Sequence, residues 1–255
     1  MIGSETIDRR SLCALFLAGS LLSDAPAGAS AAPPIRALAF DAFTIFDPGS
    51  VTAAVVSAFG AHGREIARAW TSKIFELSWL ETAAGRYSGL SALADAALAY
   101  SARTSGMELS PAQRRELVAM FGELSVWPDA GDVLERLRKD GRRLAFLSNL
   151  SAEILVSNMK RAGLERVMEP PLSTDRVAAF KPSPSAYAMG PRYLNLAKDQ
   201  IGFVAFGDWD AVGAGWFGYR VAWINRLNLP AGALAPAPDI VASGLEGALR
   251  LCAGR

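Results

Sequence analysis

The sequence predicts an α/β fold in which a Rossmann-like, mostly parallel sheet forms the core and an all-helical cap is inserted into it. Short apolar runs bounded by turn residues alternate with helical patterns along residues 125–255, as in strand–helix–strand units. Residues 51–124 carry helical periodicity and no convincing strand. Apolar residues make up 51% of the 255-residue chain, which is enough for a sizeable core.

The first predicted strand runs from Ile35 into Asp41 and follows Pro33 and Pro34. Its unbroken apolar run is typical of a strand buried on both faces. In open α/β sheets, ligands bind beyond the carboxyl ends of the strands, which is where Asp41 stands. A carboxylate there can act as nucleophile, base or metal ligand. The alternative is that Asp41 only caps the turn that follows.

Apolar residues spaced three and four apart predict long amphipathic helices after this strand. The residues that carry this spacing are Ile66, Trp70, Ile74, Leu77, Leu80, Leu90, Leu93, Ala97 and Leu98. We therefore expect a helical cap over residues 51–124, inserted into a core made of residues 34–50 and 125–255.

The elements after the cap alternate between helix and strand, so right-handed crossovers place their strands parallel. The segment Trp127-Pro128-Asp129 breaks the chain before the first helix, and Gly163 is a natural end for the second. The predicted elements are a helix over 130–139, a strand over 143–148, a helix over 152–161, a strand over 201–206, a helix near 211–217 and a strand over 219–224.

Composition excludes several classes of function. The chain has 26 Lys and Arg against 25 Asp and Glu, so it has no overall field that would gather nucleic acid or bind an anionic membrane. His62 is the single histidine, which excludes any Ser-His-Asp site that does not use it. With only two cysteines besides, no zinc-ligand cluster can form. Carboxylate, lysine and hydroxyl chemistry remain.

Residues 1–31 have the pattern of an export signal. Arg9-Arg10 precedes an apolar run from Ser11 to Leu22, and Ala29-Ser30-Ala31 suits a signal peptidase. The run is shorter than the ~20 residues that a membrane-spanning helix needs. The paired arginines resemble a twin-arginine signal, which implies a periplasmic or secreted protein. The alternative is a disordered or amphipathic leader on a cytoplasmic protein.

Polar side chains follow several of the predicted strands. These residues are Asp41, Ser148, Asn149, Lys181, Asp208 and Asp210. Each alone is explained by a cap, a turn or a solvated loop. Together, at one edge of a parallel sheet, they form a site in which an ammonium faces carboxylates and hydroxyl or amide donors hold an anion.

From about residue 35 to 253 the chain resembles the haloacid dehalogenase-like superfamily of hydrolases, and within it the type II 2-haloacid dehalogenases. The resemblance rests on several motifs in order: Phe40-Asp41-Ala42-Phe43, Trp70-Thr71-Ser72-Lys73, Leu147-Ser148-Asn149, Phe180-Lys181-Pro182-Ser183-Pro184 with Tyr187, Trp209-Asp210-Ala211-Val212-Gly213-Ala214, and Phe217 to Asn225.

The resemblance implies hydrolytic dehalogenation of short 2-haloalkanoic acids without a metal or cofactor. Asp41 would form an ester with the substrate, Lys181 would keep Asp41 ionised, and Asp210 would activate the water that cleaves the ester. The residues expected to contact the substrate are Ala42, Phe43, Ser148, Asn149, Tyr187 and Trp209. The expected partner is a small 2-halocarboxylate, and the apolar cap helices are compatible with a homodimer.

Some positions differ from the family pattern. Thr71 stands where the family has the Arg that receives the halide, and Arg68 is a candidate substitute one turn away. Thr44 directly follows Phe43, where the family has Gly before Thr, and Ala205 and Gly207 replace a Ser and an Asn.

These differences keep two alternatives open. Phosphatases of the superfamily carry a second Asp two residues after the nucleophile, and Phe43 cannot serve as that acid. Gly207-Asp208 nevertheless resembles a phosphatase motif, so a Mg²⁺-dependent phosphatase that uses Asp41, Asp208 and Asp210 is the first alternative. The second is a catalytically impaired homologue that binds a small carboxylate or a protein partner.

Overall fold

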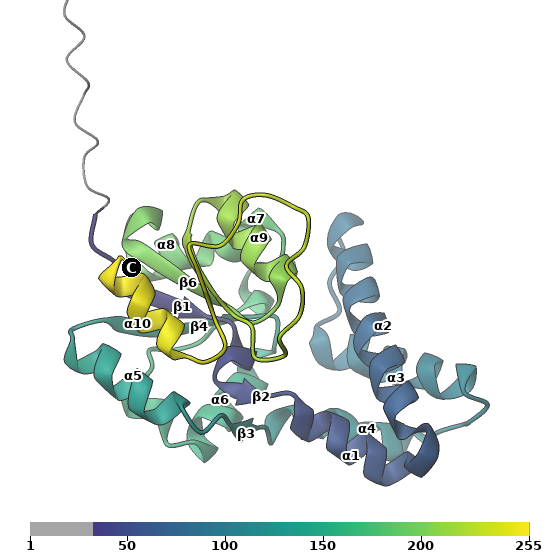
Figure 1. Cartoon of the computed structure of the whole chain (residues 1–255). Helices are drawn as coiled ribbons and strands as arrows, with labels where there is room; N and C mark the ends of the chain where they lie inside the picture. The colour runs from purple at the N-terminus through teal and green to yellow at the C-terminus, as the bar shows by residue number, and fades with distance from the viewer. Residues whose placement is uncertain (1–32, 255) are drawn as a thin grey trace, which may run out of the picture. The chain divides into compact units, whose positions relative to one another are not determined.

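The central sheet in the described residues, 33–254 of this computed structural model, has the strand order β5-β4-β1-β6-β7-β8. Figure 1 labels its strands β4, β1 and β6. Every neighbouring pair in the sheet is parallel, which confirms the predicted parallel sheet. The strands are β1 (Ala37–Phe40), β4 (Arg143–Ser148), β5 (Leu172–Ser173), β6 (Ile201–Ala205), β7 (Arg220–Ile224) and β8 (Ile240–Ala242).

Two layers of helices cover the sheet, because side chains alternate between its faces. In β1, Leu38 and Phe40 pack into one apolar layer, and Ala37 and Ala39 pack into the other. The first layer is shared with α5 (Ala130–Lys139), α6 (Ala152–Arg161) and α10 (Glu246–Ala253). The second is shared with α7 (Pro184–Tyr187), α8 (Met189–Leu194) and α9 (Asp208–Phe217).

Helices α5 and α6 have the bounds that the sequence predicts. Helix α6 begins where the Ser151 hydroxyl accepts a hydrogen bond from the Ile154 amide at 3.3 Å. It ends before Gly163, whose φ of 67° is a left-handed conformation that glycine adopts without strain. Local capping therefore sets both ends of this helix.

The helical insertion between β1 and β4 is also confirmed. It contains α1 (Gly49–Phe59), α2 (Gly63–Ala83), α3 (Leu90–Thr104) and α4 (Pro111–Ala119). The indole N–H of Trp70 in α2 donates to the carbonyl of Ala94 in α3 at 2.7 Å, which links the two helices at their buried interface. The first helix begins two residues before the expected boundary of the cap.

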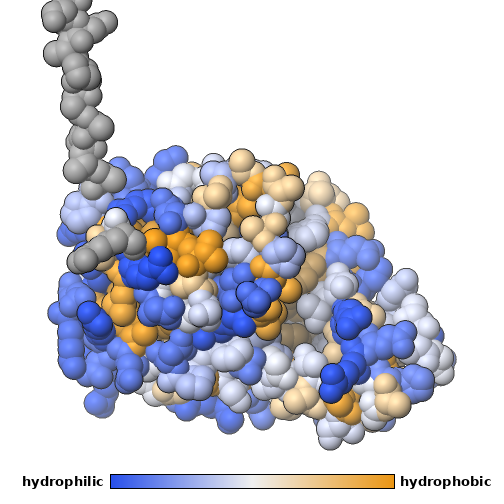
Figure 2. All heavy atoms as spheres, in the orientation of Figure 1, coloured by the Kyte–Doolittle hydropathy of each residue, from blue (hydrophilic) through white to orange (hydrophobic). Residues whose placement is uncertain are grey.

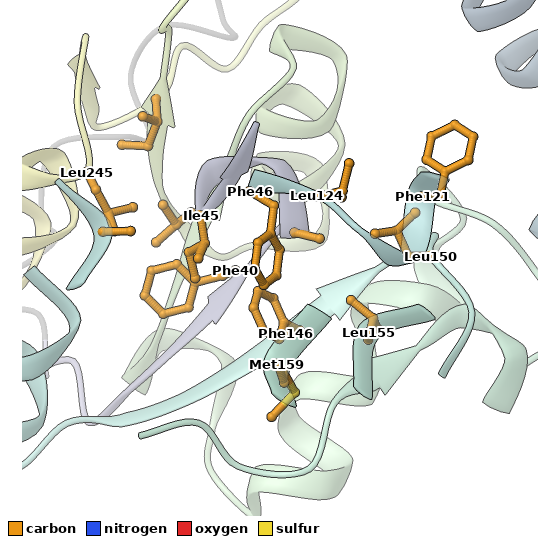
Figure 3. Packing of buried hydrophobic residues seen from close by; sticks show 14 of the residues in the cluster. Phe40, Ile45, Phe46, Phe121, Leu124, Phe146, Leu150, Leu155, Met159 and Leu245 are labelled. Carbon is orange, nitrogen blue, oxygen red and sulfur yellow. The ribbon is translucent and has the colours of Figure 1, made fainter. Parts of the chain in front are cut away.

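A short ribbon and an apolar cluster connect the base of the insertion to the sheet domain. A two-stranded antiparallel ribbon of β2 (Phe46–Asp47) and β3 (Ser125–Val126) joins the two chain segments that enter and leave the cap. Beneath it the rings of Phe46 and Phe146 stack with centroids 5.5 Å apart (Figure 3). The apolar cluster continues through Leu150 to Phe121 at the end of the insertion, so sheet domain and cap share one core.

The shortest elements were not anticipated from the sequence. Strands β2, β3, β5 and β8 have two or three residues, which is too few to show a hydrophobic periodicity in the sequence. Helix α10 was not predicted either. The predicted export signal, residues 1–31 with Arg9, Arg10 and Cys13, lies outside the described residues, and export stays a prediction. Within residues 33–254, no helix combines the length and hydropathy needed to cross a membrane.

Candidate active site

The site forms where the carboxyl ends of neighbouring strands meet. Asp41 follows β1, Ser148 ends β4, and Asp210 lies in the first turn of α9, just after β6. Because β4, β1 and β6 are adjacent and parallel, these residues reach one edge of the sheet. Lys181 arrives at the same edge from the segment before α7.

Lys181 lies between two carboxylates. Its ammonium Nζ donates to Oδ2 of Asp41 and to Oδ2 of Asp210, each at 2.7 Å. The lysine side chain has no exposed surface, while Asp41 is 8% exposed and Asp210 1%. The ring of Phe203 lies 5.2 Å from Nζ and adds an attraction between cation and aromatic face. Buried charges of this kind are tolerated because they are paired.

The Asp41 carboxylate is held on several sides. The Phe43 amide donates to Oδ1 of Asp41 at 2.9 Å, in the short 3-10 turn that follows β1 (Ala42–Thr44). The main chain of Asp41 donates to the Val204 carbonyl at 2.9 Å and accepts from the Thr44 hydroxyl at 2.7 Å. Asp41 is therefore both a turn cap and a member of the charged cluster, so the two sequence interpretations coexist.

Lys181 and Asp210 are oriented by further hydrogen bonds. The Lys181 amide donates to Oδ1 of Asn149 at 2.8 Å, and the neighbouring Phe180 amide donates to the Thr82 hydroxyl of the cap at 3.0 Å. The Tyr187 hydroxyl donates to Oδ1 of Asp210 at 2.7 Å. Both oxygens of Asp210 are thus occupied by donors.

Burial and charge shift the proton affinities in this cluster. Burial alone lowers the pKa of Lys181, but the carboxylates of Asp210 and Asp41 outweigh it and raise that pKa, so the ammonium keeps its charge. Burial raises the pKa of Asp210 to about 6, although Lys181 opposes the rise. Burial also raises the pKa of Tyr187, which keeps its hydroxyl as a donor. The three charged groups carry one excess negative charge, and Asp210 is the carboxylate that takes up a proton near pH 6.

Asp41 and Asp210 line a cavity of about 500 Å³ between the sheet edge and the cap. The predicted site residues on its wall, besides these two, are Phe43, Thr71, Ser148, Asn149, Asp208 and Trp209. The Ser148 hydroxyl oxygen accepts from the Leu150 amide at 3.2 Å, which leaves its proton to donate into the cavity. The carboxamide oxygen of Asn149 is used by Lys181, so its NH₂ group is the part that can serve a ligand.

Other predicted residues lie elsewhere. Tyr187 was expected in the cavity wall, but it is fully buried behind Asp210 and acts on that carboxylate instead. Ala42 and Thr44 are buried in the turn after Asp41. Arg68 is exposed and contributes, with Arg64, to a second and more open cavity of about 680 Å³, because it lies on the outer side of α2.

Thr71 does not replace a cation. Its hydroxyl donates to the carbonyl of Ala67 at 3.0 Å, one turn back in α2, so the proton is used within the helix. Among residues 33–254, the wall of the main cavity contains no Lys, Arg or His. A leaving anion therefore meets aromatic and apolar groups there.

Several residues of the cavity wall were not predicted, because no motif or pattern in the sequence marks them as site residues. Phe206 packs edge-on against Phe43 with ring centroids 6.0 Å apart, and Phe75 packs against Trp209 at 5.3 Å. Leu227 and Leu229 in the β7–β8 connection also line the cavity. Only the rule that sites follow the carboxyl ends of strands could have pointed to the β7–β8 connection.

The acidic residues at the site do not converge as metal ligands. In the part of the chain that the structure describes, no three His, Cys, Asp or Glu side chains are grouped to hold a metal ion. Asp208 accepts from its neighbouring Trp209 amide at 2.8 Å, and Asp41 and Asp210 both face the Lys181 ammonium.

Comparisons with known proteins find related hydrolases. The family model "Hydrolase: haloacid dehalogenase-like hydrolase" matches residues 23–218. The haloacetate dehalogenase H-2 of Moraxella sp. (strain B) is 31% identical over 86% of this chain and 98% of its own. The (S)-2-haloacid dehalogenase of Pseudomonas sp. (strain YL) is 32% identical over 85% of this chain and 94% of its own.

The same similarity extends to solved structures. The structure of the L-2-haloacid dehalogenase from Xanthobacter autotrophicus with chloropropionic acid covalently bound has a TM-score of 0.80 to this chain. The two chains are 30% identical, and the match covers 86% of this chain and 99% of the other.

Replacing Lys181 by Met should lower the free energy of unfolding by about 3 kcal/mol at pH 8, because it leaves two buried carboxylates facing each other. The loss should be smaller at pH 4, where Asp210 is protonated in the native protein. Urea unfolding of the native protein and the variant at both pH values measures this loss of unfolding free energy. The control is Lys139→Met, which removes an exposed pair with Glu135 and should change little. An equal loss at the two pH values would contradict the charge argument.

Proposed function

Because the chain belongs to the haloacid dehalogenase-like hydrolase family, we propose that it hydrolyses the carbon–halogen bond of 2-haloalkanoic acids through an ester on Asp41. The observation that carries the proposal is the Asp41 carboxylate itself, which is bound to a lysine ammonium, held by a backbone amide and open to a largely apolar cavity. The curated relatives named above, which are dehalogenases of haloacetate or 2-haloacids, support the same reaction.

In the first step, a carboxylate oxygen of Asp41 attacks carbon 2 of the substrate, and the carbon–halogen bond breaks with its electron pair on the halide. Lys181 favours the ionised nucleophile and fixes its direction. The Ser148 hydroxyl and the Asn149 NH₂ group are the donors that hold the substrate carboxylate. Phe43 and Trp209 keep bulk water from the reacting carbon.

In the second step, water attacks the carboxyl carbon of the Asp41 ester. Asp210 takes one proton of that water, and the acyl C–O bond of the ester then breaks with its electron pair on the 2-oxygen of the product. That oxygen takes up the second proton of the water to become a hydroxyl, Asp41 is left as a carboxylate, and Asp210 releases its proton to solvent. The products are a 2-hydroxy acid and the restored enzyme. Carbon 2 is attacked once only, so its configuration is inverted.

Asp41→Asn should lower halide release from 2-bromopropanoate by at least about a thousandfold, because the amide is a poor nucleophile. A single turnover of the native enzyme in ¹⁸O-water should place ¹⁸O in Asp41, detected by peptide mass. The matched control is Asp47→Asn, which changes another carboxylate on the cavity wall and should leave most activity. Halide release that survives Asp41→Asn would rule out this nucleophile.

The rate should depend on the protonation of Asp210. Since burial raises the pKa of Asp210 to about 6, kcat should fall about tenfold per pH unit below that value. The Asp210→Asn variant should be at least about a hundredfold slower and should lack this acidic limb. A pH–rate profile of both proteins measures it, and an unchanged limb in the variant would assign it to another group.

The same pKa has an effect on stability. Between pH ~4 and 6 the native protein binds more protons at Asp210 than the unfolded chain, in which an Asp titrates near 3.9. The contribution of Asp210 to stability is therefore fully present below pH ~4 and is lost as the pH rises through about 6. The Asp210→Asn variant should not show this loss.

In the described part of the chain, no Lys, Arg or His lies on the cavity wall to receive the departing halide, so the reaction should be sensitive to the leaving group. The ratio of kcat/KM for 2-bromopropanoate over 2-chloropropanoate should fall at least about threefold in Thr71→Arg, because a guanidinium near the cavity stabilises the poorer leaving group more. Halide release from both substrates measures the ratio. Thr71→Gln, of similar reach but neutral, is the control, and an equal fall in both variants would contradict the role of charge.

The lack of Lys, Arg and His on the cavity wall, among the residues that the structure describes, also supports the alternative of an impaired homologue that binds small carboxylates without turnover. No halide release from any 2-halo acid, with a raised melting temperature in propanoate, would favour it. Hydrolysis of an aryl phosphate that requires added Mg²⁺ would instead favour the phosphatase alternative, which uses Asp41, Asp208 and Asp210.

A further inference from the structure

The cavity above Asp41 has two chemically different halves. One half, here called the polar floor, is formed by Asp41, Ser148, Asn149 and Asp210 at the sheet edge. The other half, here called the apolar chamber, lies among the cap helices α1, α2 and α3. The apolar chamber is lined by Val51, Val55, Ala67, Trp70, Ile74 and Leu90.

The whole cavity, polar floor and apolar chamber together, is larger than a short halo acid requires. A cavity of about 500 Å³ lies within the ~300–1,000 Å³ that is typical of sites for drug-sized ligands. A 2-halopropanoate held at the polar floor would leave most of that space to water against apolar walls, and such water finds few hydrogen-bond partners. The space is therefore better filled by hydrocarbon.

The chamber walls belong to the folded core and face the cavity instead of bulk solvent. All six residues of the apolar chamber are at most 8% exposed. Polar groups beside them are already satisfied inside the cap: Trp70 donates to Ala94 at 2.7 Å, and the Ser78 hydroxyl donates to the Phe75 carbonyl at 2.8 Å. These walls offer a ligand apolar contact and favour a tail without polar groups.

The wall of the cavity nearest to solvent is apolar as well. Leu227 and Leu229 line the cavity although 59% and 54% of their surface is exposed, respectively. Two hydrogen bonds between Asn225 and Leu229, at 2.8 and 2.9 Å, shape this segment of the β7–β8 connection. Figure 2 shows apolar residues gathered over the β7–β8 connection, at the top of the view. An apolar substrate tail therefore contacts apolar side chains before it enters the cavity.

We infer that the substrate is a 2-halo acid whose carbon 2 carries a long apolar substituent, an alkyl chain of about four to six carbons, seated in the apolar chamber. This inference rests on the proposed function, because it puts the carboxylate and the reacting carbon at the polar floor. Binding energy from the tail then places carbon 2 against Asp41.

A chain-length series tests the inference by halide release. From 2-bromopropanoate through 2-bromobutanoate and 2-bromohexanoate to 2-bromooctanoate, kcat/KM should rise about fourfold for each methylene buried. In Ala67→Leu, which grows a side chain into the chamber, the octanoate-to-propanoate ratio should fall at least about tenfold. The matched control is Ala69→Leu, on the same helix but outside the cavity wall, which should keep the native ratio.

A binding measurement separates this inference from the reaction. Octanoate, which has no halogen, should raise the melting temperature of the native protein at concentrations where propanoate has no effect, and Ala67→Leu should abolish the difference. Halide release that does not increase with chain length would overturn the inference and leave the proposed function standing. Octanoate binding without halide release from any substrate would overturn the proposed function and support the chamber. If octanoate does not bind and no substrate releases halide, both the inference and the proposed function are overturned.

Discussion

The Lys181 ammonium, held at 2.7 Å by both Asp41 and Asp210, is the interaction on which the rest of the site depends. A buried ammonium without these carboxylates would lose its charge or unfold its surroundings, and the carboxylates without it would repel each other. The mutual dependence explains why the groups can be almost fully buried and ionised together. It also fixes the direction of the Asp41 carboxylate relative to the cavity.

The fold brings the three charges together from distant parts of the chain. Asp41 and Asp210 are fixed because β1 and β6 are adjacent parallel strands and end at the same edge of the sheet. Lys181 is not on a strand, and its segment is held by Asn149 on one side and by Thr82 of the cap on the other. The cap therefore takes part in positioning the lysine as well as in enclosing the cavity.

Enclosure by the cap divides the cavity by polarity. The sheet edge supplies carboxylates and hydrogen-bond donors, whereas α1, α2 and α3 supply hydrocarbon. In such a low-dielectric space the charge on Asp41 is poorly solvated and more reactive, and an ion pair to Lys181 is stronger than in water. The same apolar surface that activates the nucleophile offers a place for a hydrocarbon tail, so reactivity and substrate selection come from one feature of the cap.

The sequence by itself determined the alternation of the longer strands and helices, the helical insertion, and the candidate pair of Asp41 and Lys181, because these follow from local periodicity and from motifs of a few residues. Export stays a prediction from residues 1–31. Only the tertiary structure decided that Tyr187 lies behind Asp210, that Thr71 uses its proton within α2, and that Arg68 faces another cavity. Side-chain direction and cavity shape depend on contacts between residues far apart in the chain, and no local pattern carries that information.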